Sequence, residues 1–197
     1  MPDYDRIQCD LVIQSEKPHE FGLRQKGISG TICSWLLRDF LRSEFPYVKF
    51  DEGTVCSAGK KGWYKSDQFS PQCDIIAYRG SPWERLYEYV VIPKKNVFLT
   101  IEVKKWISLS DVIDRNEKYN KQIKTLRQST EKSVFLVAYR TSSSMEKIKQ
   151  GSVADKTYIF SGSTGTRYPD YVEDFDTRFV VKGELKRLVK DIRNIVK

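Results

Sequence analysis

Two apolar runs of strand length that carry charged side chains constrain the fold more than any other feature. Asp74 leads the first run, residues 75–77, and the second run, residues 97–103, holds Glu102 with Lys104 directly after it. Side chains of a β-strand alternate between its two faces, so Glu102 and Lys104 point to the same side. Removing charges from water is costly unless they are paired or bind an ion, so this pattern calls for a specific explanation.

The two carboxylates favour a metal site. Asp74 and Glu102 would hold one or two Mg²⁺ or Mn²⁺ ions, which prefer carboxylate oxygens, and the backbone carbonyl of Val103 would add a ligand. Lys104 would contact an attacking water or stabilise charge that develops on a phosphate. The alternative is an edge strand on which Glu102 and Lys104 pair at the surface, as many exposed ion pairs do.

An Asp-led strand followed by Glu-x-Lys at the end of another strand resembles the PD-(D/E)xK nuclease superfamily. The similarity is greater to an uncharacterised bacterial branch of that superfamily, over roughly residues 26–125. The matching residues are Ser70, Gln72, Asp74, Ile75, Ile76, Tyr78, Pro93, Val97, Ile101, Glu102, Val103 and Lys104. The resemblance implies the restriction-endonuclease-like α/β fold, a three-layer core with a mixed central β-sheet flanked by helices. It also implies one nuclease-like domain over residues 1–197.

The resemblance implies a further acidic ligand near the first helix of the fold. In the related branch a Glu lies four residues after a Gly, but counting from Gly27 that position is Thr31. The chain therefore departs from the pattern, and Glu20 would supply the carboxylate from upstream. The alternative for Glu20 is a solvated loop carboxylate.

The resemblance also implies that the helix after the Glu-x-Lys strand adds a side chain to the site. Gln, Lys or Tyr takes this role in several branches, and the candidates here are Lys118, Tyr119 and Gln122. Lys118 and Gln122 are one helical turn apart and share a face. We assign Gln122 to catalysis and Lys118 to nucleic-acid binding. The alternative is a solvated basic face.

The charge of the chain favours a polyanionic partner. Its 34 Lys and Arg against 26 Asp and Glu give a net charge of +8. Residues 57–69 mix basic and aromatic side chains, which suits phosphate contacts with stacking on an exposed base, or else a hairpin loop whose Trp covers the core edge. The residues assigned to nucleic-acid binding are Lys60, Lys61, Trp63, Lys65, Gln72, Lys105 and Lys118.

Apolar periodicity predicts the remaining elements. Helices are expected at residues 29–45, at 109–128 with Ser110 as the N-cap, and at 183–196. Strands are expected at 48–56 and 133–139, and the second should pair in parallel with the Glu102 strand after a helical crossover. Residues 17–22 contain a Pro and a Gly, which predicts a break.

Several other function classes are disfavoured. The four cysteines are scattered and His19 is the one histidine, so we expect neither a structural zinc site nor a Ser-His or Cys-His nucleophile. No apolar run approaches the length of a membrane span, and the N-terminus lacks the apolar block of a signal peptide. We therefore expect a cytoplasmic protein without a membrane partner.

Two functions stay open at this point. The first is a Mg²⁺- or Mn²⁺-dependent nuclease, with DNA favoured over RNA, for which a duplex break would call for a homodimer. The second is a catalytically inactive nucleic-acid-binding or assembly module that keeps the nuclease fold. The missing acidic residue on the first helix favours the second function, whereas the retained Asp, Glu and Lys favour the first.

Overall fold

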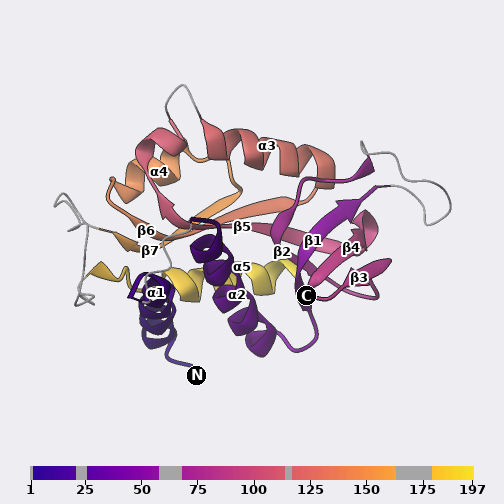
Figure 1. Cartoon of the computed structure of the whole chain (residues 1–197), viewed down its shortest axis with the longest axis horizontal. Coiled ribbons are helices and arrows are strands. Elements are labelled where there is room, and N and C mark those ends of the chain that lie inside the picture. The colour runs from indigo at the N-terminus through magenta and orange to yellow at the C-terminus, as the bar shows by residue number, and fades with distance from the viewer. Residues whose placement is uncertain (1, 21–25, 58–67, 114–116, 163–178) are drawn as a thin grey trace.

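A central β-sheet between two layers of helices forms the fold in the computed structural model, which describes residues 2–20, 26–57, 68–113, 117–162 and 179–197 (Figure 1). Within these ranges the strands are β1 Lys49–Cys56, β2 Cys73–Tyr78, β3 Glu84–Leu86, β4 Tyr89–Pro93, β5 Val97–Ile107, β6 Ser133–Thr141 and β7 Lys156–Gly162. The helices are α1 Tyr4–Glu20, α2 Lys26–Glu44, α3 Lys118–Thr130, α4 Met145–Gly151 and α5 Glu184–Ile195, with short 3₁₀ turns η2 Lys94–Asn96 and η3 Leu109–Asp111. The predicted three-layer α/β fold is confirmed.

The sheet is mixed, in the order β3-β4-β1-β2-β5-β6-β7. β2 is antiparallel to both of its neighbours, β1 and β5. β5, β6 and β7 are parallel, with Glu102 opposite Leu136, so the predicted parallel pairing after a helical crossover is confirmed. None of the helices among the described residues is long and apolar enough to cross a membrane.

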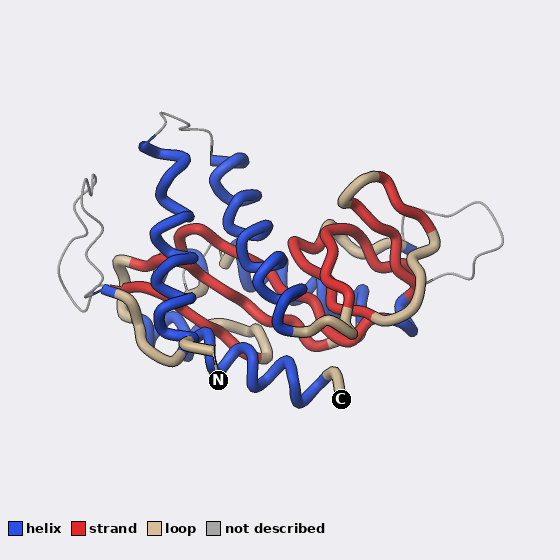
Figure 2. The backbone as a smooth tube through the Cα atoms, turned by 90° about the horizontal axis from the view of Figure 1, so that it is seen from below, coloured by secondary structure: helices blue, strands red, loops and turns tan. Residues whose placement is uncertain are grey.

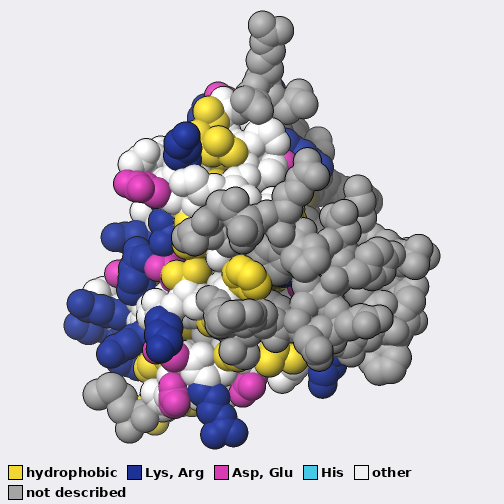
Figure 3. Space-filling view, turned by 90° about the vertical axis from the view of Figure 1, so that its left-hand side faces the viewer, with side chains coloured by type: hydrophobic (Ala, Val, Ile, Leu, Met, Phe, Trp, Pro, Cys, Tyr) yellow, Lys and Arg dark blue, Asp and Glu magenta, His cyan; other side chains and the backbone are white. Residues whose placement is uncertain are grey.

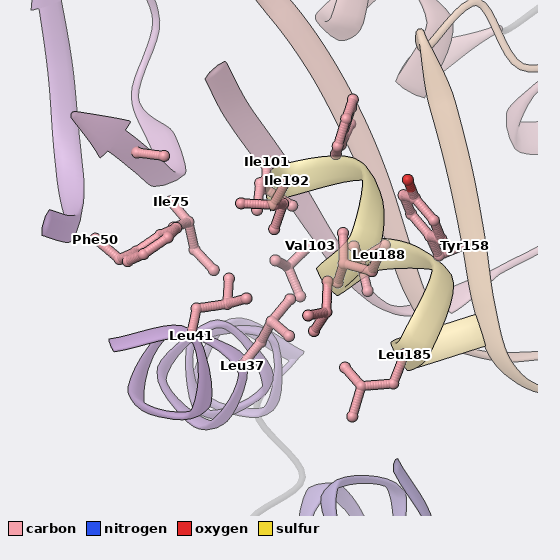
Figure 4. Packing of buried hydrophobic residues seen from close by; sticks show 14 of the residues in the cluster. Leu37, Leu41, Phe50, Ile75, Ile101, Val103, Tyr158, Leu185, Leu188 and Ile192 are labelled. Atoms are coloured by element: carbon pink, nitrogen blue, oxygen red, sulfur yellow. The ribbon is translucent and has the colours of Figure 1, made fainter. Parts of the chain in front are cut away.

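Each face of the sheet has its own apolar core. The first core lies between the sheet and α1, α2 and α5, which share one face in Figure 2, and Figure 4 shows Leu37, Val103 and Leu188 meeting there. The second core lies between the sheet and α3 and α4, and includes Ile123 and Leu136. Because β5 lies between the two cores, alternate side chains of this strand enter different layers.

The predicted break at residues 17–22 is wrong over its first part, because α1 continues beyond Pro18. The buried side of α1 includes two polar residues, Gln8 and Ser15, both fully buried. Gln8 Nε2 donates a hydrogen bond to the carbonyl of Phe160 at 2.9 Å, which offsets the cost of its burial. These polar residues interrupt the apolar period that would otherwise identify the helix.

The helix predicted over residues 109–128 begins later than expected. Ser108, not Ser110, caps the η3 turn, because its backbone N–H and its hydroxyl both donate to Asp111 Oδ2, at 2.8 and 2.6 Å. α3 itself starts at Lys118. The helices expected at 29–45 and 183–196 and the strands expected at 48–56 and 133–139 are confirmed to within a few residues.

A buried carboxylate joins the β3–β4 hairpin to α2. Asp51 of β1 accepts hydrogen bonds from Tyr78 Oη at 2.6 Å, from Arg85 Nη2 at 2.8 Å and from Arg42 Nη2. Burial alone would raise the pKa of Asp51, but the hydrogen bonds from Arg85 and Tyr78 and the arginine charges hold it below its usual value. The ionised carboxylate therefore stabilises the contact of the hairpin with the helix.

We expect Asp51→Asn to lower the free energy of unfolding by about 3 kcal/mol at neutral pH, because it leaves two arginines without their buried partner. The folded-state pKa lies below the unfolded value of about 3.9, so this stabilisation is complete above that pH and is lost as the pH falls through the folded-state pKa. Urea unfolding of the wild type and of Asp51→Asn should show that the difference between their free energies of unfolding narrows in acid. Asp39→Asn, at an exposed ion pair, is the control and should cost less than about 1 kcal/mol.

Candidate active site

The site forms where β2 and β5 separate. Their pairing ends with Ile75 opposite Ile101, and Asp74 Oδ2 then accepts a hydrogen bond from the backbone N–H of Val103 at 2.8 Å. The N–H and C=O of one strand residue point to the same side of the strand, so the carbonyl of Val103 also faces Asp74. A carboxylate and a backbone carbonyl therefore lie at one opening in the sheet.

Glu102 lies at the centre of the site and is 1% exposed. Its Oε1 accepts a hydrogen bond from Gln122 Nε2 at 2.7 Å and pairs with Lys104 Nζ. Its Oε2 is buried and has no hydrogen-bond partner among the residues that the structure describes. An unsatisfied buried carboxylate oxygen is costly, so this atom is available to a cation.

The charges of the site compete with one another. Burial raises the pKa of Glu102 to about 7, and the negative charge of Asp74 adds to this effect. Burial also raises the pKa of Asp74, against the opposing effects of the Lys104 charge and the Val103 N–H. Burial would lower the pKa of Lys104, but the charges of Glu102 and Asp74 raise it overall. A divalent cation at the two carboxylates would favour their ionised forms together.

The donor set fits Mg²⁺ or Mn²⁺ chemically. Asp74, Glu102 and the Val103 carbonyl are hard oxygen ligands, the type that these ions prefer. No group of three or more His, Cys, Asp or Glu side chains suited to a metal lies together in the described part of the chain. A bound ion would therefore keep water in its remaining positions, as Mg²⁺ commonly does.

Helix α3 forms the second wall of the site. Besides the bond from Gln122 to Glu102, the ring of Tyr119 lies under the ammonium of Lys104, with Nζ 4.8 Å from the ring centroid. Gln122 and Tyr119 come from one helical turn, because they are three residues apart. Lys118, the third residue suggested on this helix, is exposed, and its Nζ is 5.9 Å from the centroid of the Tyr119 ring.

Not all of the predicted site residues meet here. Gln72 is exposed and donates to Glu52 Oε1 at 2.5 Å. Lys105 is 14% exposed, and its Nζ lies 3.4 Å from Glu16 Oε2 of α1, the helix that covers the first core. The side chain of Lys105 is therefore directed away from Lys104. The side chain of Glu20 and the residues Lys60, Lys61, Trp63 and Lys65 lie outside the described part of the structure.

Glu16 is an acidic residue that the sequence analysis did not single out. Besides Lys105, it contacts Arg140, with Glu16 Oε1 2.8 Å from Arg140 Nη1. The signal in the sequence was its position one turn before Glu20 on the same helical face. In the structure Glu16 neutralises cations at the ends of β5 and β6.

Solved structures share this fold. NucC of P. aeruginosa ATCC27853 in its cAAA-bound form matches with a TM-score of 0.62 and 12% identity, over 100% of this chain and 93% of that chain. NucC of E. coli MS115-1 matches in its cAAA-bound form with a TM-score of 0.64 and 13% identity, over 98% and 90% of the two chains. The apo form of the E. coli MS115-1 NucC matches with a TM-score of 0.54 and 14% identity, over 96% of this chain and 91% of that chain. No protein-family model and no curated protein matches the sequence.

We expect Mn²⁺ to raise the unfolding temperature of the wild-type chain, because an ion that binds only the folded state stabilises it, by about 2.7 kcal/mol at a hundredfold excess over Kd. Asp74→Asn should abolish most of this rise, because it removes a charged ligand. Asp39→Asn, at an exposed surface carboxylate, is the control and should respond as the wild type does. Equal Mn²⁺-dependent shifts in all three proteins would contradict a metal site at Asp74.

Proposed function

We propose that this chain is a metal-dependent nuclease of the PD-(D/E)xK type that hydrolyses phosphodiester bonds, with DNA as the favoured substrate. The observation that carries the proposal is the convergence of Asp74, Glu102 and Lys104, with one buried oxygen of Glu102 left open for a cation. The fold shared with the NucC structures supports the proposal, because it provides the same layered framework.

Each side chain of the site has a role in this reaction. Asp74, Glu102 and the carbonyl of Val103 would hold Mg²⁺ or Mn²⁺, which supplies a Lewis acid and lowers the pKa of bound water. The Lys104 ammonium directs the attacking water and stabilises negative charge on the phosphate. Gln122 fixes the Glu102 carboxylate through its 2.7 Å hydrogen bond, so the carboxylate is oriented before substrate arrives.

The alternative is a catalytically inactive module that binds nucleic acid with the same fold. One observation favours it, since the described residues bring only two carboxylates to the site. Against it, a binding module has no need for Lys104 beside two carboxylates that share a poorly solvated space.

Cleavage assays test the proposal directly. Plasmid, linear duplex DNA, single-stranded DNA and RNA should be incubated with Mg²⁺ or Mn²⁺, using wild type, Glu102→Ala and Lys104→Ala. We expect metal-dependent cleavage that each substitution lowers by about a hundredfold or more, the effect of losing one group that stabilises charge in the transition state. Lys95→Ala, at an exposed residue of η2, is the matched control and should cleave normally.

The assay should be repeated with cAAA, because two of the similar NucC structures hold this ligand. Cleavage that requires cAAA would identify a ligand-controlled nuclease. Absence of cleavage under every condition, together with absence of Mn²⁺ binding, would contradict the nuclease and leave the binding module.

Tyr119 should contribute through its ring and not through its hydroxyl. We expect Tyr119→Phe to keep cleavage near the wild-type rate and Tyr119→Leu to lower kcat about tenfold, because a desolvated cation–π contact contributes about 1–2 kcal/mol. Kinetics on the best substrate, with KM measured alongside kcat, distinguishes these outcomes. Equal losses in both variants would instead assign the role to the hydroxyl group.

A further inference from the structure

A strongly cationic surface lies on the face of the sheet opposite to the active site. α5 packs against the sheet through the first core, whereas α3 and the active site lie on the other face (Figure 1). The exposed side of α5 and its flanks carries six cations. Arg187 pairs with Glu184, and the other five are here called the α5 cationic surface: Lys182, Lys186, Lys190, Arg193 and Lys197. Figure 3 shows Lys and Arg side chains along one side of the molecule, with Asp and Glu side chains among them.

The acidic residues of this segment do not neutralise the surface. Glu184 is 4% exposed and pairs with Lys149 at 3.0 Å and with Arg187, and Asp191 accepts a hydrogen bond from Tyr158 Oη at 2.7 Å. Residues 182–197 contain six Lys or Arg and two acidic residues, so they carry a net +4, half of the +8 of the chain.

The cations are also poorly compensated from neighbouring elements. Arg193 pairs with Glu44 of α2 at 2.6 Å, and Asp5 of α1 bonds the backbone N–H of Gly183 at the start of the helix. The four lysines of the surface make no ion pair with the described residues. Lys186 and Lys190 are four residues apart, a spacing at which like charges destabilise a helix. The chain therefore keeps a repulsive arrangement that a bound anion would relieve.

We propose that the α5 cationic surface binds the phosphate backbone of a nucleic acid, separately from the strand in the active site. The rise of an α-helix places Lys186 and Lys190 about 6 Å apart along the axis, and Lys186 and Arg193 about 10.5 Å apart. Duplex DNA carries one negative charge per about 1.7 Å of its axis, so the row of cations faces several phosphates at once.

The composition of the α5 cationic surface favours a nucleic acid over a membrane or a protein as its partner. Interfacial helices insert apolar side chains into lipid, but the apolar residues of α5 at 185, 188, 189 and 192 are at most 1% exposed. Protein interfaces are depleted in Lys and have aromatic residues at their centre, which this surface lacks. A row of lysines without apolar neighbours suits phosphate, which Lys binds as a point charge.

Salt dependence of binding tests the proposal without any cleavage. Fluorescence anisotropy of the full chain with duplex DNA and with RNA, in EDTA and over a range of NaCl concentrations, gives the slope of log K against log salt. We expect K186Q/K190Q to reduce the slope for DNA by about 1.8, since each lysine that no longer neutralises a phosphate removes about 0.9. The matched control is K147Q/K156Q, two exposed lysines on α4 and β7, and it should keep the wild-type slope.

The two nucleic acids separate the possible sources of phosphate, since a change with RNA alone would assign the surface to RNA. An unchanged slope in K186Q/K190Q, or a change equal to that of the control, would overturn the proposal. The proposal also fails if K186Q/K190Q loses binding to phosphatidylserine vesicles while its nucleic-acid slope stays at the wild-type value. Since binding is measured without metal, failure of the nuclease proposal would leave this result standing.

Discussion

The buried carboxylate of Glu102 is the constraint on which the rest of the structure depends. At 1% exposure it needs partners, and it finds Lys104 on its own strand and Gln122 on α3. α3 must therefore pack over β5 at the position along the strand where the side-chain amide of Gln122 reaches Glu102 Oε1. The same helix connects the parallel strands β5 and β6. The α3 crossover thus covers the second core and also completes the candidate site, so one helix contributes to both.

Strand β5 divides its side chains between two layers. Ile101 and Val103 enter the first core, whereas Glu102 and Lys104 face α3. A register slip of one residue would direct the charged pair into the first core and the apolar pair toward the site. The backbone N–H of Val103 also holds Asp74, so the carboxylate from β2 is positioned by the strand that carries Glu102. Geometry of the site therefore follows from sheet pairing.

Alternation along a strand is a local rule, which is why the sequence predicted that Glu102 and Lys104 share a face. The neighbouring position of the Asp74 strand came from family resemblance. Gln122 came from family resemblance, because its contact with Glu102 depends on where α3 docks. Side-chain contacts between segments that are distant in the sequence were not predictable from local patterns. The period of α1 is interrupted by buried Gln8, whose partner is the carbonyl of Phe160. Lys105 follows Lys104 directly in the sequence, but its partner Glu16 comes from the opposite layer.

The docking of α3 has a consequence for chains that are still being synthesised. Asp74, Glu102 and Lys104 all precede α3 in the sequence, but Gln122 and Tyr119 reach them only after α3 has packed against β5 and β6. Domains fold as units during synthesis, and this packing needs β6, which leaves the ribosome later. A nascent chain therefore carries the charged triad without the amide and the ring that hold it in place. The full geometry of the candidate site is therefore reached only once the strands after α3 have been synthesised.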